Sequence, residues 1–142
     1  MTLDIFVDTN IFIRVLIGDC EAEIFSACRG ILEKIRSKEY AGYTSHLVLA
    51  EINWTLRRYY SFSRDETAEA MSGVLNLKNL KMLDNFNAGY ALELYKRHSA
   101  KFIDCMISSI SEIRTGKMRV VSYDRDFDKL GAKRLEPPCT PQ

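Results

Sequence analysis

Residues 3–17 read LDIFVDTNIFIRVLI, and they predict the first two elements of the fold. Its first six residues, LDIFVD, form a short apolar run that favours the β conformation, which predicts a buried strand. The next nine residues are apolar apart from one arginine and predict a helix, which Asp8 can cap and Gly18 can end. A buried strand that leads directly into a helix is typical of an α/β sheet.

The same alternation continues along the rest of the chain. Further strands are expected over 40–44, 80–83, 118–122 and 133–135, and helices over 21–38, 45–60, 63–77, 84–98, 102–114 and 126–130. Strands joined by helical crossovers are typical of a parallel sheet that is covered on both faces. We therefore predict an α/β fold of three layers, with a mostly parallel central sheet of four to five strands flanked by helices.

Some of these helices carry more specific expectations. The helix over 45–60 has apolar side chains on two faces, so we expect it to be buried between other elements. One face holds Leu49, Ile52 and Leu56, and the other holds Leu47, Ala50 and Trp54. Ser63 and Glu66 have the spacing of a capping box that opens the next helix. Asp84 or Asn85 is expected to cap the helix over 84–98.

The chain has 142 residues and a mass of 16.3 kDa, which suits one hydrophobic core. All three prolines lie at or after position 137, so we expect one domain over 1–136 and a short tail over 137–142. There is no recognisable signal peptide and no apolar run near 18 residues, so we expect a cytoplasmic protein without membrane contact. The cysteines lack metal-ligand spacing and are expected to be buried thiols. They are Cys20, Cys28, Cys105 and Cys139.

The formal charge of the chain is only +1, so net charge gives no argument for nucleic-acid binding. The distribution is uneven, however, because residues 96–134 carry ten Lys and Arg against five Asp and Glu. Residues 1–95 carry ten against thirteen. Two interpretations stay open: both halves have ordinary solvated helix faces, or the basic second half holds a polyanion.

Two acidic residues follow predicted strands. Asp8 ends the first strand, and Asp124 comes just after the strand over 118–122. The carboxyl ends of parallel strands meet at one edge of a sheet, where ligands bind in this class of fold. Taken alone, Asp8 is also a good helix cap and Asp124 a good turn residue.

Two further acids interrupt apolar helices. Glu51 lies in LVLAEINW, over 47–54, and Asp104 is the single charge in FIDCMI, over 102–107. Each either faces solvent on a narrow stripe or is buried with a partner. For Asp104 a polar stripe is possible, since Ser108 and Ser111 lie four and seven residues further on.

Together the four acids indicate a cation site. Carboxylates about 5 Å apart repel one another by about 3 kcal/mol per pair at an effective dielectric constant near 20. Oxygen ligands without a nearby His or Cys favour Mg²⁺ or Mn²⁺ over zinc. Such ions commonly act on phosphodiesters, either singly or as a pair about 4 Å apart.

Four stretches of the chain, in this order, resemble the PIN-domain nucleases. They are VDTNIF at 7–12, Glu51 in its apolar helix, FIDCMI at 102–107 and VSYDRDF at 121–127. The chain most resembles the toxin ribonucleases of VapBC toxin–antitoxin systems, over about residues 1–136. Asp8, Glu51, Asp104 and Asp124 match the acidic quartet of that family. Thr9, Asn10 and Ser122 match polar residues that support it.

The resemblance has two departures. Cys105 stands where the family commonly has alanine, a small change that should leave ligation intact. The fourth acid is not unique, because Asp126 and Asp128 follow Asp124 closely. Asp124 is preferred because it is nearest to the strand end, and Asp126 is the alternative, with capping of the short helix as its other role.

The resemblance implies metal-dependent hydrolysis of RNA that leaves a 5′-phosphate and a 3′-hydroxyl. Asp8 and Asp104 would hold the principal Mg²⁺ or Mn²⁺ ion, and Asp124 would support it. Glu51 would complete the cage, or orient or deprotonate the attacking water. His46 and His98 are isolated and are not needed as bases. The implied partners are RNA, a small antitoxin protein and a second copy of the chain, as a homodimer.

Basic and aromatic side chains are candidates for RNA binding. Phosphate contacts without sequence readout are expected from Arg14, Lys96, Arg97, Lys101 and Arg125. Tyr59, Tyr60 and Tyr123 could stack on bases, although packing is the more ordinary role for each of them.

Other functions are weighed against the nuclease. A phosphatase of the haloacid dehalogenase type needs a second aspartate where this chain has Asn10, and a receiver domain needs an acid pair that Asp4 does not provide. Within the nuclease class, an RNA-processing PIN nuclease without an antitoxin is the alternative. A catalytically inactive PIN scaffold that binds RNA or protein is a further one, against which the retention of all four acids argues.

Overall fold

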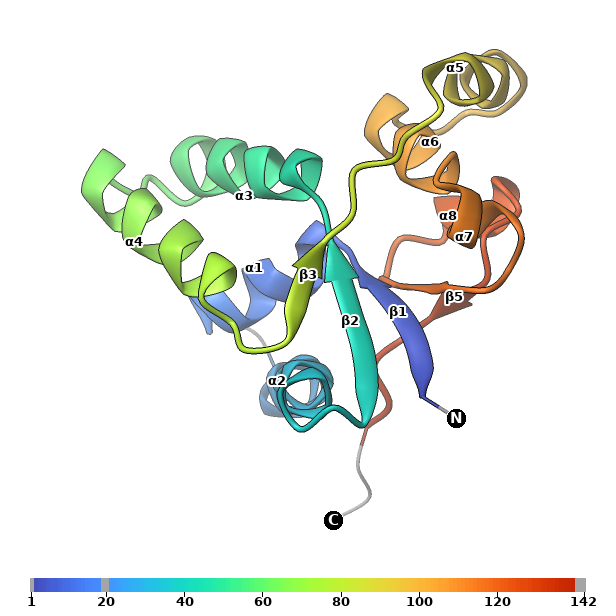
Figure 1. Ribbon diagram of the computed structural model, residues 1–142. Helices are drawn as coiled ribbons and strands as arrows, with labels where there is room; N and C mark the ends of the chain where they lie inside the picture. Colours follow the sequence, from blue (N-terminus) through green and yellow to red (C-terminus); the bar gives the residue numbers. More distant parts are fainter. Residues whose placement is uncertain (1, 19–20, 140–142) are drawn as a thin grey trace.

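The structure is a computed structural model that describes residues 2–18 and 21–139. A sheet of parallel strands runs through its centre, and helices lie on both sides (Figure 1). The strands are β1 (Leu3–Val7), β2 (Tyr40–Thr44), β3 (Leu80–Met82), β4 (Arg119–Val121) and β5 (Arg134–Leu135). The helices are α1 (Thr9–Ile17), α2 (Ala22–Arg36), α3 (His46–Tyr59), α4 (Arg64–Leu75), α5 (Ala88–Arg97), α6 (Phe102–Ser108), α7 (Ser111–Arg114) and α8 (Asp126–Lys129).

The strands form one five-stranded sheet in the order β3-β2-β1-β4-β5, and every pairing is parallel. The predicted three-layer α/β fold is therefore confirmed. Strand β1 lies at the centre, and its last three side chains, Ile5, Phe6 and Val7, are completely buried. Helices α1 to α4 form one packed group and α5 to α8 another, as Figure 1 shows.

Strand β2 packs closely on α2. A Cβ atom at Gly42 would lie 2.6 Å from side-chain carbons of Ile35, so only glycine fits there without a shift. This contact fixes the distance between the helix layer and the strand beside β1.

The two ends of α1 explain how Asp8, which follows the first strand, is positioned. Asp8 stands at the N-cap position of α1, but within the described residues its carboxylate makes no capping hydrogen bond. Its backbone N–H donates to the carbonyl of Val121 at 3.1 Å, which ties the end of β1 to the end of β4. Gly18 ends α1 in the left-handed conformation, at φ 69°. The side chain of Asp8 is therefore available for another purpose.

Several local predictions are wrong, each for a physical reason. The helix over 102–114 is two helices, because Ile110 is extended and the Ser109 hydroxyl donates to the carbonyl of Met106. Asn87, rather than Asp84 or Asn85, caps α5. Asp84 accepts a hydrogen bond from the backbone of His46, and the Asn85 amide donates to Glu112. The capping box of Ser63 and Glu66 is confirmed.

Helix α3 buries one face, not two. Val48, Ile52 and Leu56 are completely buried, whereas Trp54 on the other face is 58% exposed. The expectation of burial between elements fails because no described element covers that side. Cys28 and Cys105 are buried as expected, but Cys139 is exposed, and Cys20 lies outside the described residues.

Candidate active site

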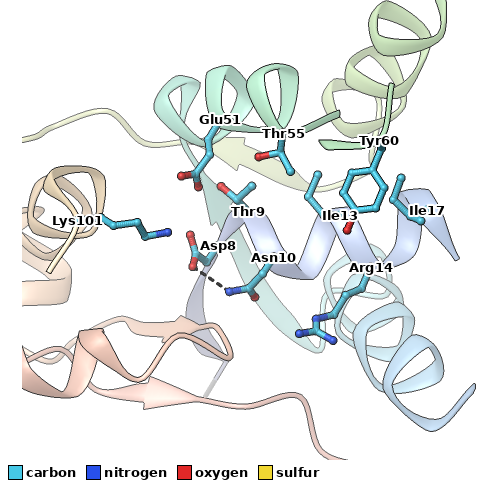
Figure 2. A pocket seen from close by; sticks show the side chains of 10 residues that line it. All are labelled: Asp8, Thr9, Asn10, Ile13, Arg14, Ile17, Glu51, Thr55, Tyr60 and Lys101. Carbon is cyan, nitrogen blue, oxygen red and sulfur yellow. Dashed lines mark hydrogen bonds between the residues drawn. The ribbon is translucent and has the colours of Figure 1, made fainter. Parts of the chain in front are cut away.

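A pocket of about 330 Å³ opens beyond the carboxyl end of β1, between α1, α3 and the start of α6 (Figure 2). Its acids are Asp8 and Glu51, and Lys101 faces them from the other side. The lining residues are Asp8, Thr9, Asn10, Ile13, Arg14, Ile17, Glu51, Thr55, Tyr60 and Lys101. The topology explains the position, because crossover connections leave a crevice at this edge of a parallel sheet.

Asp8 is held by two of the three polar residues expected to support it, Asn10 and Ser122, whereas the buried hydroxyl of Thr9 has no hydrogen-bond partner among the described residues. One carboxylate oxygen, Oδ2, accepts a hydrogen bond from the Ser122 hydroxyl at 2.7 Å and a longer one from the Asn10 amide at 3.4 Å. The Asn10 amide also donates to the Ser122 oxygen at 3.0 Å. The other oxygen, Oδ1, is buried and has no hydrogen-bond partner among residues 2–18 and 21–139. The carboxylate is thus oriented through one oxygen and leaves the other open.

Glu51 extends from α3 toward Asp8 across the pocket (Figure 2). Burial raises the pKa of Asp8 to about 6, and the negative charge of Glu51 adds to this rise. The hydrogen bond from Ser122 opposes it. Glu51 is half-buried, so it does not face solvent on a fully exposed stripe.

Asp104 lies on α6 and is 1% exposed. Burial raises the pKa of its carboxyl to about 9, with contributions from a hydrogen bond to Asp124 and from the charge of Asp8. Its Oδ2 atom is buried and makes no hydrogen bond to any residue that the structure describes. The solvent-facing polar stripe is wrong, because Ser108 on the same face is 2% exposed.

The pKa of Asp124 shifts in the opposite direction. Burial tends to raise its pKa, but the net effect is a lowered pKa. The carboxylate accepts hydrogen bonds from Asp104 and from the backbone N–H of Asp126, and the Lys101 ammonium is nearby. The pKa of Asp104 is therefore raised and that of Asp124 lowered, although the two carboxyl groups lie side by side.

The three acids after β4, Asp124, Asp126 and Asp128, differ in the basic residue with which each forms an ion pair. Asp128 forms a two-bond ion pair with Arg134, at 3.1 and 3.2 Å. Asp126 pairs with Lys129 at 3.2 Å, and Asp124 pairs with Lys101 at 3.8 Å. Carboxylate oxygens of Asp104, Asp124 and Asp126 lie within 4.8 Å of one another. Asp124 and Asp126 thus both remain close to Asp104, whereas Asp128 is engaged elsewhere.

The arrangement fits a hard divalent cation. Asp8 and Asp104 each present a buried carboxylate oxygen that has no hydrogen-bond partner in the described parts of the chain. Leaving such oxygens unpaired is costly unless a cation binds them. All the acidic donors are oxygen atoms, which suit Mg²⁺ or Mn²⁺. The four candidate carboxylates come from the residue that follows β1, from α3, from α6 and from the turn after β4.

The basic candidates fall into two groups. Lys101 and Arg14 line the pocket, and the Arg14 guanidinium stacks on the ring of Tyr123 at 4.5 Å. Lys96 and Arg97 lie on α5, exposed and paired with Glu93, and are not part of the pocket lining. Arg125 is exposed at the start of α8.

The aromatic candidates and the histidines are placed as follows. Tyr60 lines the pocket, whereas Tyr59 is 70% exposed and outside the lining. Tyr123 packs under Arg14, with its hydroxyl 3.8 Å from the Cys28 sulfur. His46 pairs with Asp84 at 2.6 Å, away from the pocket.

Sequence reasoning missed part of the pocket wall. Ile13, Ile17 and Thr55 line it and were not singled out. A helical spacing could have found them, because Thr55 is four residues after Glu51 and Ile17 is four after Ile13. Side chains four residues apart lie on the same face of a helix, so Thr55 shares the face of Glu51.

The parallel sheet and the acids at its edge are those expected of a PIN domain, and comparison with protein families agrees. Residues 5–133 match the PIN domain, so the chain belongs to the PIN domain family. This membership excludes the phosphatase and receiver-domain alternatives.

The chain is also similar to individual proteins of this family. The chain is 27% identical over 132 residues to a VapC ribonuclease of Aquifex aeolicus, covering 92% of this chain and 94% of that protein. Its fold is similar to VapBC2 from Rickettsia felis, solved with a DNA fragment from their promoter, at a TM-score of 0.69, 17% identity and coverage of 94% and 98%. It is also similar to VapC20 of Mycobacterium tuberculosis, a toxin that cleaves the sarcin–ricin loop, at a TM-score of 0.63, 17% identity and coverage of 94% and 100%.

Proposed function

We propose that this protein is a metal-dependent endoribonuclease, and that it is the toxin of a toxin–antitoxin pair. One observation carries the proposal: acids from four separate segments meet at one edge of the sheet and leave two buried carboxylate oxygens unpaired within the described residues. Membership of the PIN family and the likeness to a VapC ribonuclease support the choice of RNA as substrate.

The proposed ligands of the ion are Asp8 and Asp104, with Asp124 in support and Asp126 as the alternative fourth acid. A bound Mg²⁺ or Mn²⁺ ion would lower the pKa of a water molecule and stabilise the negative charge that develops on the phosphate. Ser122 and Asn10 hold Asp8 in a fixed orientation. Thr9 lies between them in sequence and lines the same pocket.

The other pocket residues handle the water and the RNA. Glu51 faces the pocket and would complete the cage around the ion, or orient or deprotonate the attacking water. Lys101 and Arg14 would contact phosphates, because they are the basic side chains in the pocket lining. Lys96, Arg97 and Arg125 would contact the RNA only further from the cleavage position. Water attack would leave a 5′-phosphate and a 3′-hydroxyl.

The partners are part of the proposal. A small antitoxin would place a basic side chain in the acidic pocket and so block the site, because the pocket needs positive charge. A homodimer is proposed from the family likeness. We also propose residues 1–136 as the nuclease domain, 137–142 as a tail, and the cytoplasm as the compartment. Across the described residues, no helix is both long and apolar enough to cross a membrane.

Two alternatives share the fold. A PIN nuclease that processes RNA without an antitoxin would use the same acids. A PIN scaffold that only binds RNA or protein would have no need of the unpaired carboxylate oxygens, and the nuclease is therefore favoured.

The test is a cleavage assay on total RNA with Mg²⁺, Mn²⁺ or EDTA. We expect cleavage by the wild type with either metal and none in EDTA. Asp8→Asn and Asp104→Asn should each lower the rate by a factor of about 100 or more, since each removes a charged ligand. Glu69→Gln is the matched control, because Glu69 is exposed on α4 outside the pocket. Equal cleavage by the wild type and both aspartate variants would disprove the site. RNA binding without cleavage in any metal would favour the scaffold.

A further inference from the structure

Lys101 occupies an unusual position for a residue that only binds substrate. It stands at the N-cap position of α6, three residues before Asp104. Its ammonium lies 3.8 Å from Asp124 Oδ2 and points toward Asp8 and Glu51 in the pocket (Figure 2). All four candidate acids act electrostatically on this one ammonium group. The chain thus places a positive charge of its own beside the acidic cluster, on a side chain that is 60% exposed.

This position matters for the number of ions. In sites with two metal ions, the ions lie about 4 Å apart and clamp both sides of the reacting phosphate. The one ion already proposed is held by Asp8 and Asp104 with support from Asp124, and oxygens of Asp104, Asp124 and Asp126 lie within 4.8 Å of one another. A second ion would be held on the side of Glu51, and the Lys101 ammonium extends into that side.

An ammonium group and a second divalent ion would exclude each other there. Two positive charges at such short range repel each other, and the repulsion grows with the double charge of the metal ion. The ion pair with Asp124 keeps the ammonium close to the acids.

We propose that the Lys101 ammonium takes the place of a second divalent ion, so that this site binds one ion where a two-ion site would bind two. The same ammonium then meets the phosphate on the side of Glu51 that a second ion would otherwise cover. The inference rests on the proposed function, because it specifies how the nuclease site is charged.

Ion counting tests the proposal without RNA. EDTA-treated protein is titrated with Mn²⁺ by isothermal calorimetry, and free Mn²⁺ is followed in parallel by electron paramagnetic resonance. We expect one ion per chain for the wild type and for Lys101→Arg, which keeps the charge. We expect two ions for Lys101→Gln, in which the second position is vacated. Lys96→Gln is the matched control and should bind one ion, because Lys96 is exposed and paired with Glu93.

Every outcome decides the question. Two ions in the wild type, or one ion in both the wild type and Lys101→Gln, would overturn the proposal. A second readout guards against misfolding, since the Mn²⁺-dependent rise in melting temperature shows that each variant is folded. If the counts change as expected but no RNA is cut, the proposed function fails and the inference stands. If RNA is cut but the ion counts do not change, the inference fails and the proposed function stands. If no Mn²⁺ binds at all, both the inference and the proposed function fail.

Discussion

At the scale of single residues, the site depends on carboxyl groups that cost stability when no cation is bound. The pKa of Asp8 is raised to about 6 and that of Asp104 to about 9, both chiefly by burial. In the unfolded chain both would ionise near pH 4. The folded, metal-free protein therefore holds protons that the unfolded chain releases between about pH 4 and pH 9.

Stability without metal should accordingly fall as pH rises through this range, because the unfolded state binds fewer protons than the folded state. In the proposed function, Mn²⁺ would bind the ionised carboxylates and remove this cost. We predict that the rise in melting temperature on adding Mn²⁺ is larger at pH 8.5 than at pH 5.5. Differential scanning fluorimetry of EDTA-treated protein measures it, with Asp104→Asn as the control whose pH dependence should be flatter. An equal Mn²⁺ effect at both pH values would contradict the charge state assigned to the acids.

At the scale of elements, the distance between the sheet and α2 is fixed by the absence of a side chain at Gly42. An alanine there would meet Ile35 at 2.6 Å, and the packed interior leaves little room for movement. We predict that Gly42→Ala lowers the free energy of unfolding by about 1 to 3 kcal/mol.

Gly73→Ala is the matched control, because Gly73 lies within α4 and a Cβ atom there meets nothing within 4 Å. It should be neutral or stabilising, by up to about 1 kcal/mol, since alanine favours the helix. Urea unfolding followed by circular dichroism compares the two. A Gly42→Ala variant as stable as the wild type would show that α2 can move away from the sheet.

Much at this scale could be predicted from the sequence. The β1 and β2 strands, the capping box at Ser63 and the parallel sheet all follow from local patterns, and the structure confirms them. The break between α6 and α7 could not be predicted, because it depends on a hydrogen bond from Ser109 that competes with the helix. The exposure of Trp54 also escapes a pattern, since it depends on which elements happen to cover α3.

The site shows the same division. Position in the alternation of strands and helices was enough to select Asp8 and Asp124, and an isolated charge in an apolar helix selected Glu51 and Asp104. The structure brings these four side chains to one edge of the sheet, and their role as ligands stays a prediction. The sequence could not show that Asp128 is engaged elsewhere, because only the three-dimensional fold places Arg134 beside it.

At the scale of the whole molecule, the arrangement of the strands supports the proposed function. We propose that the fold gathers separated acids at one edge of the sheet so that a metal-activated water hydrolyses RNA there. This chemistry differs from that of ribonucleases in which the RNA 2′-hydroxyl is the nucleophile, because the two reactions leave different ends. The products therefore report the mechanism, and they also distinguish this protein from a contaminating ribonuclease.

The most direct measurement is the chemistry of the ends produced from a single RNA by purified protein in Mn²⁺. The account predicts a 5′-phosphate and a 3′-hydroxyl, formed by the wild type and not by Asp104→Asn or in EDTA. Mass spectrometry of the fragments identifies both ends. Fragments ending in a 2′,3′-cyclic phosphate, or cleavage that persists in EDTA, would contradict it.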